Sequence, residues 1–211
     1  MQILSPTNEK RMLKMEYSAG NVSNLLWFVE MRETAKLLQT MDMKEVADKV
    51  VKENLYQQKS ENRAKREFGC IKKRLSALPT KLVEEMIRAD INTAKLIALV
   101  AAMSTDLLLF ELVYEVYRIK LNMDEDSLKD ADLNMFFNRK IEQSEEIASW
   151  SESAIKKLKQ TYCKYMQEAG LLQEPANNER KITKPYIDWE LRNILIDYNM
   201  EKYLYALTGE R

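Results

Sequence analysis

The part of this sequence best suited to chemistry with a partner is a basic run at residues 59–74, KSENRAKREFGCIKKR. It holds seven positive side chains against two negative ones, in a protein whose formal net charge is zero. Charge gathered in this way favours binding to a polyanion, and the backbone of a nucleic acid is the most plausible one. The alternative is a solvated basic helix that pairs with an acidic zone of the same chain.

Helical geometry divides the basic run into two faces. Ser60 is a good N-cap, and apolar residues follow from Ala64 to Leu78 at spacings of four and three, which is typical of a buried stripe. The opposite face, at about 100° per residue, includes Gly69, where the lack of a side chain would allow a DNA backbone or another protein chain to approach closely. We expect the residues of this face and its flanks to contact DNA: Asn62, Arg63, Lys65, Arg66, Lys72, Lys73 and Arg74.

A second candidate surface lies on a helix expected over residues 151–169. Gly170 suits the left-handed position that ends a helix, and residues 171–185 then have the pattern of a β-hairpin with its turn at 175–179. A helix, a basic-faced helix and a hairpin in this order form the layout of a winged helix, which can bind DNA or another protein. The predicted contacts are Ser153, Lys156, Lys157, Gln160 and Lys164 on the helix, and Arg180 and Lys181 on the hairpin.

Catalysis finds little support in the residue types. The chain contains no histidine, so the usual general base is missing, and its four glycines are isolated rather than gathered in a phosphate-binding loop. Cys70 and Cys163 do not form the usual four-ligand zinc site without histidine, and we expect both to be packing residues. The sequence therefore predicts a protein that is not an enzyme and has no cofactor or metal.

The elements that must position these surfaces are mainly helices. The sequence is 45% hydrophobic and has only four glycines and four prolines, which favours helices with short connections. We expect residues 1–15 to form a mobile or loosely docked arm. The predicted helices cover residues 23–39, 43–53, 60–78, 80–89, 92–105, 107–121, 130–142, 151–169 and 189–207.

Charge zones suggest how the chain is organised. Residues 43–78 carry ten positive and five negative side chains, whereas residues 79–137 carry six and eleven. The acidic stretch at 122–126 is the predicted hinge. The fold class we predict is mainly α, with two helix-turn-helix or winged-helix-like lobes around a central helical layer and one small β-hairpin near 171–185. The predicted domains are 1–79, 80–126 and 127–211.

One apolar run, residues 96–110, raises the question of a membrane span. It is shorter than the roughly 20 residues that a spanning helix needs, and Asp106 interrupts it. We therefore expect a buried core helix followed by the start of the next helix. The first residues lack an apolar signal core, so the cytoplasm is the expected compartment.

Several short motifs occur in an order that resembles one known family. They are YSAG at 17–20, SENRAKR at 60–66, TAK at 93–95, DLNMFF at 132–137, WSES at 150–153 and EAGLL at 168–172. Together they resemble BrxA, a family of small accessory proteins of bacteriophage exclusion (BREX) defence systems. The resemblance covers about residues 17–172.

The resemblance implies an all-helical, cytoplasmic, non-enzymatic protein that binds double-stranded DNA and supports phage restriction. The predicted partners are therefore double-stranded DNA, bound with little sequence preference, and other BREX components. Two alternatives stay open at this point: an adaptor that uses the same lobes to hold proteins, and an RNA-binding helical protein. The sequence leaves the oligomeric state open.

Overall fold

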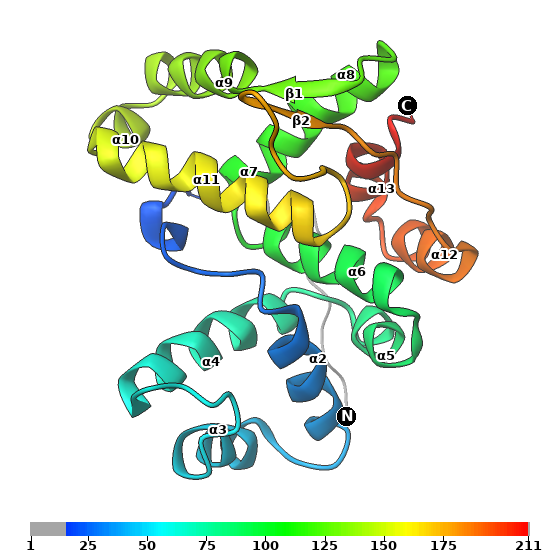
Figure 1. The fold of residues 1–211 in the computed structure, drawn as a ribbon. Helices are drawn as coiled ribbons and strands as arrows, with labels where there is room; N and C mark the ends of the chain where they lie inside the picture. The colour runs from blue at the N-terminus through cyan, green and yellow to red at the C-terminus, as the bar shows by residue number, and fades with distance from the viewer. Residues whose placement is uncertain (1–15, 211) are drawn as a thin grey trace.

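A computed structural model describes residues 16–210, so the predicted arm at 1–15 lies outside the described residues. The fold is mainly helical and has one small antiparallel sheet of two strands (Figure 1). Buried apolar residues form one continuous core that extends from Leu26 to Leu207. The predicted lobes therefore share a core, and the domain boundaries stay a prediction.

The N-terminal part consists of η1 (Ala19–Asn21), α2 (Phe28–Leu37), α3 (Met43–Lys52) and α4 (Glu61–Leu75). α3 and α4 begin close to where the sequence predicts. The side chain of Asp42 caps α3 in a capping box with Glu45, and Ser60 Oγ accepts a hydrogen bond from the backbone N–H of Arg63.

The first predicted helix begins later than expected. Residues 23–26 are not helical, and Trp27 has a left-handed backbone with φ of 53°, so that α2 starts only at Phe28. The segment of residues 21–27 runs between α4 and α11 (Glu152–Glu168), as the blue ribbon in Figure 1 shows. Its backbone carbonyls are therefore available to side chains of other elements.

The central layer contains α5 (Thr80–Arg88), α6 (Ile91–Met103), α7 (Leu107–Leu112), the π-helical turn η2 (Val113–Tyr117) and α8 (Arg118–Asn122). α6 is almost entirely buried, and the chain bends by 119° between it and the next helices, which confirms the predicted core helix followed by a new start. Asp106 lies at this bend and caps α7. No single helix in residues 16–210 has the length and apolarity of a membrane span, although the bent pair passes that test together.

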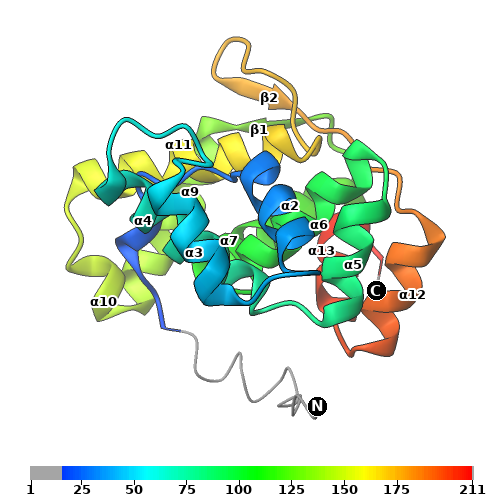
Figure 2. The same cartoon turned by 90° about the horizontal axis from the view of Figure 1, so that it is seen from below.

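The C-terminal part begins with β1 (Ser127–Lys129), α9 (Asp130–Gln143), α10 (Glu145–Ala148) and α11. After α11 the chain forms the predicted hairpin, in which residue 172 bridges to residue 182 and residue 176 bridges to residue 179. Asn177 and Asn178 form its turn, and both have positive φ, as a tight two-residue turn requires. The hairpin projects away from the helices in Figure 2. Its second strand, β2 (Glu179–Lys181), also pairs antiparallel with β1, which the sequence did not predict.

The last predicted helix is in fact two. α12 (Trp189–Asp197) and α13 (Glu201–Thr208) are separated by Asn199, whose φ of 53° interrupts the helical path. α13 packs against η2 and α8, and α12 packs against α5. The end of the described chain thus closes over the central layer.

Candidate nucleic-acid interface

α4 presents its basic residues much as its periodicity predicts. The apolar stripe from Ala64 to Leu78 is buried, while the opposite face is exposed. We call this face and its flanks the α4 ridge, and its exposed members are Asn62, Arg63, Lys65, Arg66, Gly69, Lys72 and Lys73.

The positive charge of the α4 ridge is largely uncompensated by the chain itself. Among the described residues, its one ion pair joins Lys65 Nζ to Glu61 Oε2 at 3.4 Å, and both partners are well exposed. Lys73 Nζ donates to the backbone carbonyl of Thr105 at 3.4 Å, which leaves its charge without a carboxylate. Among the described residues, no carboxylate of the acidic zone at 79–137 therefore forms an ion pair with this ridge, contrary to the alternative of a self-paired basic face.

Arg74 is the exception, and its prediction as a DNA contact is wrong. Its side chain is only 1% exposed. Nη1 donates to the carbonyls of Leu25 and Leu26 at 2.9 and 2.8 Å, and Nη2 donates to the hydroxyl of Tyr165 at 2.9 Å. The guanidinium also lies over the rings of Trp27 and Tyr165. These partners come from distant parts of the chain, so spacing along α4 could not reveal them.

Glu67 is a feature of α4 that the sequence reasoning missed. The residue is 1% exposed, and neither carboxylate oxygen has a hydrogen-bond partner among the described residues. Burial and the nearby charge of Glu30 raise the pKa of Glu67 to about 7, while Arg63 and Arg66 act in the opposite direction. The sequence signal for its burial was its position three residues after Ala64, which places both residues on the same face of the helix.

α11 carries the second predicted surface. Ser151 Oγ caps the helix by accepting from the backbone N–H of Ala154 at 3.2 Å, and Gly170 follows its end with φ of 80°, as predicted. Buried residues such as Leu158 and Tyr162 hold one face against the core. We call the opposite face the α11 ridge, and its exposed members are Ser153, Lys156, Lys157, Gln160 and Lys164.

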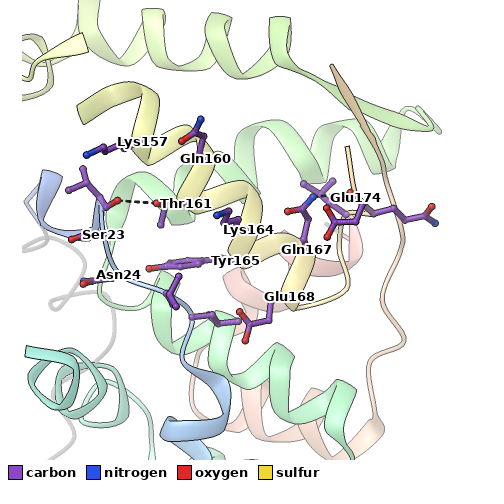
Figure 3. Close-up of a pocket in the computed structure, with 15 residues that line it drawn as sticks. Ser23, Asn24, Lys157, Gln160, Thr161, Lys164, Tyr165, Gln167, Glu168 and Glu174 are labelled. Atoms are coloured by element: carbon purple, nitrogen blue, oxygen red, sulfur yellow. Dashed lines mark hydrogen bonds between the residues drawn. The ribbon is translucent and has the colours of Figure 1, made fainter. Parts of the chain in front are cut away.

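A groove runs between the α11 ridge and the segment of residues 21–27. It encloses about 910 Å³ and is lined by residues 22–26 on one side and by α11 on the other. Figure 3 shows Lys157, Gln160 and Lys164 on the α11 side, with Ser23 and Asn24 opposite them. The groove could accept an extended polar or anionic chain. Its far end is acidic, because Glu168 and Glu174 line it there.

The hairpin contributes less positive charge than predicted. Arg180 is mostly covered, and its Nη1 donates to Asp130 Oδ1 at 2.7 Å, so this guanidinium holds β2 against the start of α9. Its prediction as a free contact at the hairpin tip is wrong, since the tip is formed by Asn177 and Asn178. Lys181 is exposed.

Neither cysteine is placed for reactivity. Cys163 is buried, and burial raises the pKa of its thiol to about 11, whereas Cys70 is partly buried against the core. Both are packing residues, as predicted. In residues 16–210, no three side chains of His, Cys, Asp or Glu gather in a way that could hold a metal ion.

Comparison with known proteins identifies the family. The model of the BrxA family matches residues 15–199. A curated relative, the "BREX protein BrxA" of Bacillus cereus (strain H3081.97), is 35% identical over 195 residues, which cover 92% of this chain and 97% of the relative. The crystal structure of an uncharacterized protein from Magnetospirillum magneticum has the same fold, with a TM-score of 0.77, 20% identity and coverage of 92% and 99% of the two chains. The chain therefore belongs to the BrxA family of BREX defence systems.

Proposed function

We propose that this protein is a non-enzymatic accessory component of a BREX system that binds double-stranded DNA in the cytoplasm. The observation that carries the proposal is the α4 ridge, whose Arg63, Arg66, Lys72 and Lys73 are exposed and have no carboxylate within 4 Å among the described residues. Cations left unpaired on one helical face attract phosphates and release the counterions of DNA on binding.

The order of elements in the C-terminal part supports a second contact. β1 is followed by α9, α10, α11 and a hairpin whose second strand pairs back onto β1, which is the arrangement of a winged helix. In helix-turn-helix proteins the second helix enters the major groove with its N-terminal residues towards the bases. α11 holds that place here, and its ridge carries Lys156 and Lys157 near its start.

The helix-turn-helix interpretation is weaker for α3 and α4. Residues 53–60 connect them, whereas the motif usually has a turn of about three or four residues. We therefore propose α4 as a surface for the phosphate backbone rather than as a reader of bases. Lysine and arginine dominate both ridges, and contacts to phosphates carry no direct sequence information. The expected result is weak sequence preference.

A salt-titrated binding assay with unrelated duplexes tests the proposal. The double variant Arg66→Glu with Lys73→Glu should weaken binding about equally on every sequence and reduce the log–log salt slope, since each phosphate contact contributes about −0.9. The matched control is Lys36→Glu with Lys81→Glu, which makes the same charge change on α2 and α5. The control should bind like the wild type.

Two outcomes would contradict the proposal. A binding constant that stays flat from low to moderate salt would exclude backbone electrostatics. Tight association with another BREX component, combined with no binding to any duplex, would favour the adaptor alternative. Competition between duplex DNA and structured RNA of equal length distinguishes the remaining alternative, because an RNA-binding protein would release the DNA.

A further inference from the structure

An exposed apolar groove lies between α8 and α9, apart from the residues proposed to contact DNA. Ile119 of α8 and Met135 of α9 line it, with the buried ring of Phe136 beside them. Met135 is 67% exposed, and Met123, one turn after Ile119, is 66% exposed, so both methionines have little packing against the described chain. The groove encloses about 170 Å³, below the roughly 300–1,000 Å³ of a small-molecule site. It therefore suits the side chains of a peptide, and methionine adapts readily to such partners.

The rim of this α8–α9 groove is acidic. Three carboxylates line it, those of Glu115, Glu125 and Asp132. The two cations that line it are already paired: Lys120 with Glu125 and Asp132, and Arg139 with Glu115 at 2.6 Å. Residues 111–142 as a whole hold eight acidic and five basic side chains. Charge complementarity therefore favours an occupant that is both apolar and basic.

The described chain begins beside the same groove. The hydroxyl of Tyr17 donates to Glu111 Oε2 at 2.9 Å. Lys140 Nζ joins this carboxylate to that of Glu115, at 2.8 and 2.7 Å, and Glu115 lines the groove. α7, η2 and α8 follow one another without a break, so Ile119 lies only about 12 Å along the helix from Glu111. The segment that precedes Tyr17 is thus tethered close to the groove.

That preceding segment, the arm of residues 1–15, has the complementary chemistry. Its apolar side chains include Ile3, Leu4, Met12, Leu13 and Met15. Its charged side chains are Lys10, Arg11 and Lys14 against Glu9 alone. Fifteen residues span at most about 50 Å, so the arm is long enough to reach the whole groove. A tether this short gives an effective concentration on the order of millimolar, at which weak contacts suffice for binding.

We propose that the arm binds in the α8–α9 groove of its own chain, with its apolar side chains on the exposed methionines and its cations at the acidic rim. The inference is independent of the proposed DNA binding. Bound in this way, the arm covers an apolar patch that would otherwise attract other proteins. The competing occupants of the groove are the arm of a second copy and a basic segment of another protein, and the tether favours the chain's own arm over both.

Photo-cross-linking in the full-length protein identifies the occupant. A photoreactive benzoylphenylalanine replaces Met12, and mass spectrometry after irradiation maps the peptide to which it attaches. The proposal predicts attachment within the monomer to residues 119–136. A covalent dimer joined at the same residues would assign the groove to the arm of a second copy and overturn binding within one chain. Attachment to other elements would overturn the groove as the binding site of the arm.

Cleavage of the arm by trypsin gives a second readout. Trypsin cleaves only the unbound arm, so the rate of cleavage after Lys10, Arg11 and Lys14 reports the binding equilibrium. Met135→Ser should speed this cleavage by about tenfold or more, because burial of an apolar side chain of this size is worth that factor. The matched control is Trp189→Ser on α12, where the side chain is 65% exposed, and it should be cleaved like the wild type. Equal rates in the wild type and Met135→Ser would contradict the proposal.

Cleavage in the presence of a saturating DNA duplex separates this inference from the proposed function. Binding in the groove predicts a protected arm without DNA, and loss of that protection in Met135→Ser. Protection that appears only with the duplex, and that Met135→Ser leaves unchanged, would assign the arm to DNA and overturn the inference. Protection that depends on Met135 in a protein that binds no duplex would support the inference and refute the proposed function alone.

Discussion

Glu67 should make the stability of this protein depend on pH in an unusual direction. Glu67 belongs to the basic helix α4, but its carboxyl is buried, and neither oxygen has a hydrogen-bond partner among the described residues. The folded state raises its pKa from 4.5 to about 7. The folded protein therefore binds this proton more tightly than the unfolded chain does, so the neutral acid stabilises the fold.

The sign and size of the effect follow from linkage. Stability from Glu67 is complete below pH 4.5 and is lost as the pH rises towards 7, where the folded protein also releases the proton. Between pH 5 and pH 8 the loss amounts to about 2–3 kcal/mol of unfolding free energy, since each pKa unit corresponds to about 1.4 kcal/mol. Above pH 8 this contribution is flat.

Urea unfolding of the wild type and of Glu67→Gln at pH values from 5 to 8 measures the contribution of Glu67 to the unfolding free energy. The amide cannot ionise, so the unfolding free energy of the variant relative to the wild type should rise by about 2–3 kcal/mol over that range. Any fixed cost of burying the amide cancels in this comparison. Glu61→Gln, on the exposed start of the same helix, is the control and should keep a constant difference from the wild type.

Parallel pH profiles for the wild type and Glu67→Gln would refute the reasoning. Such a result would mean that the carboxyl titrates as it does in water, and that α4 does not seal it from solvent. A profile that bends in the opposite direction would require a cation partner for Glu67. Arg63 and Arg66 are the cations whose charges act on this carboxyl.

Two further substitutions test the local structure. Gly69→Ala should raise the unfolding free energy by about 1 kcal/mol, because Gly69 lies in the interior of α4 and a Cβ there would meet no atom within 4 Å; an unchanged or lower melting temperature would contradict this. Tyr162→Phe should lower the unfolding free energy by about 1.5–3 kcal/mol, because the buried hydroxyl donates to both oxygens of Asp106 at 3.0 and 2.9 Å. Denaturant unfolding measures both, and a loss below 0.5 kcal/mol for Tyr162→Phe would show that Asp106 is satisfied by its other donors.

Features that depend on neighbouring residues were predictable. The Ser60 cap, the α4 ridge and the end of α11 at Gly170 follow from side chains within a few positions, and the structure confirms each of them. The hairpin turn at Asn177 and Asn178 belongs to the same class, because these residues tolerate positive φ. The mainly helical fold class follows from the same local rules.

Features that depend on distant contacts were not predictable. The sequence indicates a helix from residue 23, yet residues 23–27 are not helical, and Arg74 takes the carbonyls of Leu25 and Leu26 there. β2 pairs with β1 across about fifty residues, and Arg180 is drawn to Asp130 by that pairing. Local propensity carries no information about such partners.

The sequence by itself determined where the amphipathic helices lie and which faces carry lysine and arginine, because a period of 3.6 residues is written within each helix. Only the tertiary structure decided that Arg74 turns away from the basic face to bond Leu25, Leu26 and Tyr165, and that Glu67 is buried. Both outcomes depend on which elements pack against the sides of α4. Burial is a property of that packing, and residue type along the chain does not fix it.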